Sequence, residues 1–138
     1  MQSRVETQTP DANEDILLRA VGNPHVSIIL PTFNESRNIF ELLMLINETM
    51  VKAGYEYECI FVDDSYDSTP VVIASASRSY PGRITFIKRM GKNARTGLTM
   101  AFKRGFIEAR GAIIVCMDTD LQHPPAVITK LVSAVSEY

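Results

Sequence analysis

The chain has 138 residues, of which 46% are hydrophobic and 22% charged, values typical of one ordinary globular domain. Its formal net charge of −2 excludes the strongly basic field with which proteins recruit nucleic acid or an anionic membrane surface. No stretch approaches the roughly 20 apolar residues of a membrane span, so membrane contact is expected to be peripheral or to come from sequence outside this chain.

The N-terminal segment is polar. Residues 1–15 (MQSRVETQTPDANED) lack the basic start and the apolar core of a signal peptide, and they predict a disordered tail. Residues 16–21 are expected to form a short helical turn after that tail. We therefore assign residues 1–24 to a polar tail and residues 25–138 to the folded domain.

From residue 26 onward, short apolar runs alternate with segments of helical periodicity. Four runs predict strands: 26–30, which is expected to be buried on both faces, 57–62, 84–87 and 112–117. Four helices are predicted between and after them: 38–53, 69–79 with Thr69 as its N-cap, 99–109, and 124 to the end. This alternation predicts an α/β fold, with a mainly parallel sheet joined by right-handed crossovers and flanked by helices.

The two cysteines lie inside two of the predicted strands. Neither Cys59 nor Cys116 has a second cysteine near it, which excludes a zinc knuckle and a redox pair. We expect two buried thiols in a reducing cytosol.

Polar clusters follow three of the predicted strands, at residues 32–35, 63–65 and 118–123. In open parallel sheets, ligands bind outside the carboxyl ends of the strands. The three loops are therefore expected to share one rim, where a nucleotide diphosphate would lie.

The strongest single feature is the triplet Asp118-Thr119-Asp120, directly after a buried strand. Side chains at i and i+2 of an extended backbone point the same way, so the two carboxylates converge on one hard cation. Mg²⁺ or Mn²⁺ suits oxygen ligands and keeps waters or substrate phosphates in its shell, and Gln122 would add a carbonyl oxygen. A solvated acidic loop is the alternative; the buried strand before the triplet and the proline pair after it favour the metal.

Asp63 and Asp64 end the second predicted strand. One carboxylate at such a rim can accept hydrogen bonds from a base N–H or a ribose hydroxyl, whereas the alternative is local turn chemistry. We assign the functional role to Asp64 and structural turn roles to residues 67–69.

Two further segments allow two interpretations each. In PTFNE (residues 31–35), Phe33 would pack beside a base and Glu35 would hold a ribose or a neighbouring loop, although an ordinary strand-to-helix turn fits equally. Residues 88–97 form a glycine-bearing basic loop that matches no Walker A pattern. This loop would neutralise phosphate charge, but a solvated basic loop is an equal alternative.

Together these motifs resemble family 2 glycosyltransferases with the GT-A fold, in particular the dolichyl-phosphate mannose synthase branch and its bacterial polyprenyl-phosphate relatives. Residues 26–39 (VSIILPTFNESRNI) are similar to the opening strand and PTYNE loop, and residues 61–69 (FVDDSYDST) to the VDDGSPDGT loop. Residues 96–106 (TGLTMAFKRGF) are similar to the helix start GLGTAYIxGF. Residues 115–125 (VCMDTDLQHPP) are similar to MDADLQHPP, the most specific string.

The resemblance implies a Rossmann-like, nucleotide-sugar-binding GT-A fold and a metal-dependent, inverting hexosyl transfer to a polyprenyl or dolichyl phosphate. GDP-mannose is the first choice of donor and UDP-glucose the second, with Mg²⁺ or Mn²⁺ as cofactor. The residues that it implies around the nucleotide are Pro31, Phe33, Glu35, Val62 and Asp64. It implies that Asp118, Thr119 and Asp120 face the diphosphate, with Asp118 and Asp120 catalytic, and that Asp118, Asp120 and Gln122 hold the metal.

The chain also departs from that family. Ser65, Tyr66 and Ser68 stand where the VDDGSPDGT loop has glycines and proline, so a different turn shape is expected. Family members continue well past residue 138, and the chain is expected to be the truncated first half of a catalytic domain, inactive alone. Two alternatives stay open: a family 2 enzyme with a saccharide acceptor, or a non-catalytic fragment that binds nucleotide weakly. The expected location is cytoplasmic, at the cytoplasmic face of a membrane.

Overall fold

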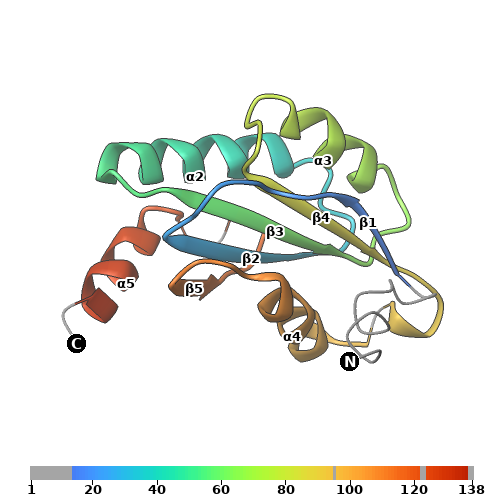
Figure 1. The fold of residues 1–138 in the computed structure, drawn as a ribbon. Coiled ribbons are helices and arrows are strands. Elements are labelled where there is room, and N and C mark those ends of the chain that lie inside the picture. The colour runs from blue at the N-terminus through green and yellow to red at the C-terminus, as the bar shows by residue number, and fades with distance from the viewer. Residues whose placement is uncertain (1–13, 95, 122–123, 137–138) are drawn as a thin grey trace.

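The computed structural model describes residues 14–94, 96–121 and 124–136. It contains a five-stranded sheet with helices on both faces (Figure 1). The strands are β1 (Glu14–Leu18), β2 (Val26–Thr32), β3 (Tyr57–Asp63), β4 (Ile84–Arg89) and β5 (Ile113–Cys116). The helices are α2 (Ile39–Ala53), α3 (Thr69–Ser77), α4 (Leu98–Glu108) and α5 (Val127–Ser136), with a 3-10 turn, η1 (Gly91–Asn93).

The sheet order is β1-β4-β3-β2-β5, and every pair except β1 with β4 is parallel. The predicted α/β fold with a mainly parallel sheet is therefore confirmed. The chain runs from β2 through β3 to β4 in one direction, and then returns to form β5 on the other side of β2. Helices α2 and α3 cover one face of the sheet and α4 covers the other (Figure 1). Ligands bind at such a reversal of strand order.

The two faces of the sheet carry separate hydrophobic clusters. The larger joins the sheet to α2, α3 and α5, and the smaller joins it to α4. All seven residues of β3 are buried, as expected for a central strand without apolar alternation. The apolar residues of α2 recur at helical spacing and are fully buried: Ile39, Leu42, Leu43, Ile46 and Met50.

Helix α4 approaches the sheet closely because a glycine faces it. A Cβ at Gly105 would lie 3.2 and 3.3 Å from Cγ1 and Cδ1 of Ile29, and nearer still to Cγ2. Ala101, one turn earlier, is also buried against the sheet. Small residues on this face therefore set how near the first turn of α4 lies to the end of β2.

The helical turn expected at residues 16–21 is wrong, because Glu14–Leu18 forms strand β1. This strand pairs antiparallel with β4 and carries a register shift between Ile16 and Leu18. It is anchored from a distance: Arg104 on α4 donates to both carboxylate oxygens of Glu14, at 2.6–2.9 Å. The sheet thus includes residues on the N-terminal side of position 25.

Three local predictions also need correction. Strand β4 extends through Arg89, so Lys88 and Arg89 lie in the sheet and not in a loop. Lys88 pairs with Asp63 at the end of β3, and Arg89 pairs with Asp64 directly after β3. The N-cap of α3 is Ser68, because Thr69 is already the first residue of the helix. Of the two thiols only Cys59 is buried; Cys116 is exposed, on a strand at the sheet edge.

Among the described residues, no helix combines the length and the apolar character needed to cross a lipid bilayer.

Candidate functional site

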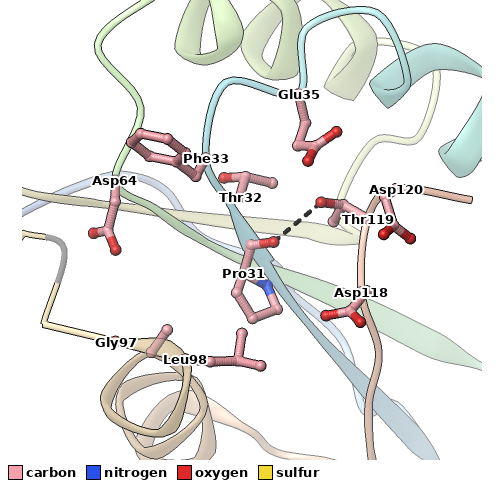
Figure 2. A pocket seen from close by; sticks show the side chains of 11 residues that line it. Pro31, Thr32, Phe33, Glu35, Asp64, Gly97, Leu98, Asp118, Thr119 and Asp120 are labelled. Atoms are coloured by element: carbon pink, nitrogen blue, oxygen red, sulfur yellow. Dashed lines mark hydrogen bonds between the residues drawn. The ribbon is translucent and has the colours of Figure 1, made fainter.

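A cavity of about 520 Å³ opens where the ends of β2 and β3 meet the start of α4 (Figure 2). Its walls come from the loops after β2, β3 and β5 and from the first turn of α4. The lining residues are Pro31, Thr32, Phe33, Glu35, Asp64, Gly97, Leu98, Ala101, Asp118, Thr119 and Asp120. The cavity lies at the reversal of strand order, because β2 has β3 on one side and β5 on the other.

Asp118, Thr119 and Asp120 leave β5 with alternating side-chain directions. Thr119 is buried, and its hydroxyl donates to the carbonyl oxygen of Pro31 at 3.1 Å, which ties this loop to β2. Asp118 and Asp120 are exposed, and both line the cavity. The next residue, Leu121, has a φ of 64°, a left-handed conformation that is strained for leucine. Gln122, the third expected metal ligand, lies outside the described residues.

Within the described ranges, no group of three or more His, Cys, Asp or Glu side chains could hold a metal ion. The two carboxylates of Asp118 and Asp120 nevertheless fit a Mg²⁺ or Mn²⁺ ion by chemistry. They offer oxygen ligands at an open rim, and such ions complete their shell with waters and substrate phosphates instead of an all-protein cage.

Asp64 lies on the other side of Pro31 from Asp118 (Figure 2). Its carboxylate is held by Arg89, which donates from Nε at 2.8 Å and from Nη2 at 2.6 Å, one bond to each oxygen. Arg89 is itself 3% exposed and also donates to the hydroxyl of Thr96 at 3.1 Å, just before α4. This bidentate pair fixes the orientation of Asp64 and leaves each oxygen a lone pair for a further donor.

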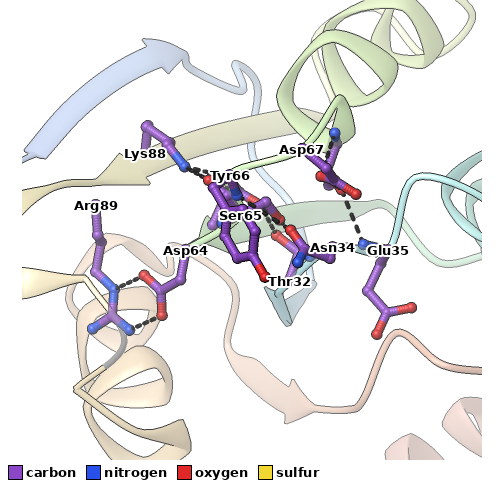
Figure 3. A network of polar contacts seen from close by, with 11 residues as sticks. Thr32, Asn34, Glu35, Asp64, Ser65, Tyr66, Asp67, Lys88 and Arg89 are labelled. Atoms are coloured by element: carbon purple, nitrogen blue, oxygen red, sulfur yellow. Dashed lines mark hydrogen bonds and ion pairs between the residues drawn. The ribbon is translucent and has the colours of Figure 1, made fainter.

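The loops after β2 and β3 are joined by hydrogen bonds (Figure 3). The backbone N–H of Asn34 donates to the hydroxyl of Ser65 at 2.7 Å, and the N–H of Glu35 donates to Thr69 Oγ1 at 2.9 Å. The N–H of Tyr66 donates to Asn34 Oδ1 at 3.2 Å. These bonds hold Asn34 in a left-handed conformation, with a φ of 54°. Ser65 therefore ties the two loops together.

The neighbours of Asn34 both face the cavity. The carboxylate of Glu35 accepts a hydrogen bond from Asn38 Nδ2 at 2.9 Å. The ring of Phe33 contacts the ring of Tyr66 edge to face, with 5.5 Å between the ring centroids. An aromatic surface and a carboxylate thus stand on one wall, opposite the first turn of α4.

The family model for glycosyl transferase family 2 matches residues 27–138. The chain belongs to this family. Relatives include the dolichol-phosphate mannosyltransferase of Pyrococcus furiosus, 42% identical over 80% of this chain and 30% of the relative. The enzyme of the same name from Saccharomyces cerevisiae is 36% identical, over 81% of this chain and 41% of the relative. An undecaprenyl-phosphate 4-deoxy-4-formamido-L-arabinose transferase of Pseudomonas fluorescens is 33% identical, over 78% of this chain and 31% of the relative.

Two solved structures share the fold. Mannosyltransferase PcManGT from Pyrobaculum calidifontis, in complex with GDP-Man and Mn²⁺, has a TM-score of 0.60 and 27% identity, over 86% of this chain and 33% of that chain. TarS of S. aureus, in complex with UDP-GlcNAc, has a TM-score of 0.63 and 22% identity, over 81% of this chain and 31% of that chain. The fold is therefore of the GT-A type. The chain spans less than half the length of these relatives.

Of the predicted site residues that the structure describes, all but Val62 line this cavity. The side chain of Val62 is fully buried in the cluster beneath α4. Four lining residues were not among the predicted site residues: Thr32, Gly97, Leu98 and Ala101. Thr32 lies in the predicted rim cluster 32–35, and the other three lie within residues 96–106, whose likeness to the family's helix start was the available signal.

Proposed function

We propose that this chain binds the nucleoside diphosphate of a nucleotide sugar, as the donor-binding part of a metal-dependent, inverting polyprenyl-phosphate glycosyltransferase. The observation that carries the proposal is the single cavity in which Asp118 and Asp120 meet Phe33, Glu35 and Asp64. Relatives named for transfer to dolichol phosphate and undecaprenyl phosphate support the acceptor class.

The residues divide the cavity into two ends. On the β3 side, Asp64 would accept hydrogen bonds from the nucleoside and Phe33 would pack beside its base, with Glu35 near the ribose. On the β5 side, Asp118 and Asp120, with Gln122, would hold Mg²⁺ or Mn²⁺ beside the diphosphate. The bound cation would stabilise charge on the departing diphosphate. The acceptor phosphate is already an anion, so its oxygen can attack the anomeric carbon without a strong base.

GDP-mannose is the proposed donor, with UDP-glucose second, supported by the GDP-Man in the PcManGT complex and by the mannosyltransferase names. Because the chain spans less than half of its relatives, we assign donor binding to this stretch and complete transfer to a longer protein. Polyprenyl phosphates are membrane lipids, so we place the reaction at the cytoplasmic face of a membrane, with contact that is peripheral or comes from sequence outside this chain.

Calorimetric titration with GDP and with UDP tests the proposal, each in Mn²⁺ and in EDTA. We expect tighter binding with Mn²⁺, and Asp120→Asn should remove most of that difference because it removes a charged ligand. Glu48→Gln, an exposed carboxylate on α2 outside the cavity, is the matched control and should keep the metal effect. Equal affinities in Mn²⁺ and EDTA would contradict the metal-dependent site.

A further inference from the structure

Asp63, the last residue of β3, has a completely buried side chain that does not line the cavity. Its Oδ1 accepts hydrogen bonds from the hydroxyls of Thr32 at 2.6 Å and Ser65 at 2.7 Å. Its Oδ2 accepts from the N–H of Ser65 at 3.2 Å and from Nζ of Lys88 at 3.0 Å. A carboxylate has about four acceptor positions, and all four are used here. Asp63 therefore has no position left for a ligand.

The hydrogen-bond partners of Asp63 lie next to the residues that form the cavity wall; Figure 3 shows three of them, Thr32, Ser65 and Lys88. Thr32 lines the cavity itself. The Ser65 hydroxyl donates its only proton to Asp63, so its oxygen can only accept from other groups. It accepts a hydrogen bond from the N–H of Asn34 at 2.7 Å. Lys88 also donates to the carbonyl oxygen of Ser65. The carboxylate thus sets the Ser65 hydroxyl, and that hydroxyl holds the strained residue between Phe33 and Glu35.

A second buried carboxylate on the same strand provides an internal comparison. Glu58 is 1% exposed, accepts from the hydroxyl of Ser27 on β2 at 2.6 Å, and pairs with Arg110 Nη2 at 3.0 Å. Asp63 and Glu58 therefore share burial, a hydroxyl donor from β2 and a cationic partner. They differ in place, since Glu58 lies near the amino end of β3 and none of its partners lines the cavity.

We propose that Asp63, paired with Lys88, is a positioning residue for nucleotide binding. It preorganises the wall that carries Phe33 and Glu35 by fixing the Ser65 hydroxyl. The inference rests on the proposed function, because that wall is where the nucleoside would bind. An amide at position 63 would keep one oxygen and face the remaining donors with an NH₂ group, so the Ser65 hydroxyl would lose its fixed direction.

The experiment compares Asp63→Asn with Glu58→Gln, measuring both urea-induced unfolding and the affinity for GDP with Mn²⁺. Both variants lose a buried charge partner, so both should be less stable. Only Asp63→Asn should weaken GDP binding, by about tenfold or more, as for the loss of a well-placed hydrogen bond. Affinities that stay unchanged in both variants, or fall equally in both, would overturn the inference.

Ser65→Ala is the second variant, because it removes the relay hydroxyl and leaves the Asp63–Lys88 pair intact. It should weaken GDP binding about as much as Asp63→Asn. The effect of Asp63→Asn should also shrink in a Phe33→Ala background, since residues that act through one contact are not additive. Additive losses, or wild-type affinity in Ser65→Ala, would show that the carboxylate does not act through this wall.

Hydrogen exchange separates this inference from the proposed function. The amide of Asn34 should exchange faster in Asp63→Asn than in the wild type, and Glu58→Gln should leave its rate unchanged. If the wild type binds neither GDP nor UDP, the proposed function fails, yet faster exchange would still show that Asp63 orders the loop. An Asn34 amide unaffected by Asp63→Asn would refute the positioning role itself.

Discussion

Replacing Gly105 by alanine should destabilise the wild-type protein. The same substitution should stabilise a variant that has a small side chain at position 29. The new Cβ would lie 3.2 and 3.3 Å from two carbons of Ile29 and closer to a third, inside the roughly 3.5–4.0 Å of a favourable carbon contact. Overpacking of this kind costs about 1–3 kcal/mol, and alanine regains about 1 kcal/mol of helix propensity. The net loss should be about 0–2 kcal/mol.

In an Ile29→Ala background the obstruction is gone, although that substitution alone should cost about 2–5 kcal/mol because Ile29 is fully buried. There Gly105→Ala should stabilise the protein by about 1 kcal/mol, from helix propensity alone. Urea unfolding of the four proteins, followed by circular dichroism, measures both effects. Stabilisation by Gly105→Ala in the wild-type background, or the same sign in both backgrounds, would refute the packing argument. Nucleotide affinity should fall with Gly105→Ala, because α4 carries Leu98 and Ala101 into the cavity wall.

Three further predictions concern other residues. Arg89→Lys should weaken GDP binding, because a lysine ammonium cannot make the bidentate contact with both oxygens of Asp64. An unchanged GDP affinity in calorimetry would contradict the role of the Asp64 carboxylate in binding the nucleoside. A thiol reagent near neutral pH should label only Cys116 in the folded protein, because Cys59 is buried and should react only after unfolding. Partial desolvation raises the pKa of the Cys116 thiol, so this thiol should react more slowly than free cysteine. Rapid labelling of both thiols would contradict this. Hydrogen bonds from Thr69 lower the pKa of Asp67 below 3.8, so the stability that Asp67 contributes is present above that pH and is lost as pH falls below it. The difference in unfolding free energy between wild type and Asp67→Ala should accordingly be present at neutral pH and vanish in strong acid.

The parts of the fold that follow from local pattern were predictable from the sequence. Continuous apolar runs gave β2 and β3 as central strands, and helical spacing gave α2. The rim position of the 118–120 triplet and of Asp64 followed from their place directly after predicted parallel strands. These features depend on neighbours within a few residues or on a general rule for parallel sheets.

The parts that failed depend on partners far along the chain. Strand β1 begins with Glu14 and Asp15, which read as a tail until Arg104, 90 residues away, holds the first of them. Lys88 and Arg89 read as a loop because nothing local reveals their carboxylate partners. The exposure of Cys116 follows from its place at the edge of the sheet, which its apolar neighbours do not reveal.

The paired charges at the end of β3 and β4 also bear on how these strands find their alignment. Apart from the ends, the pairing runs through Ile60–Thr85, Phe61–Phe86 and Val62–Ile87, and none of these pairs joins charged side chains that would fix the alignment. Among the paired residues of β3 and β4, only Asp63 and Lys88 join opposite charges. The ion pair between Asp64 and Arg89 comes directly after them and, because side chains alternate along an extended chain, lies on the opposite face. A slip of one residue would turn each carboxylate away from its cation and toward the wrong face. Neutralising both pairs together should therefore permit misaligned strands, visible as heterogeneous amide signals in an otherwise folded sheet.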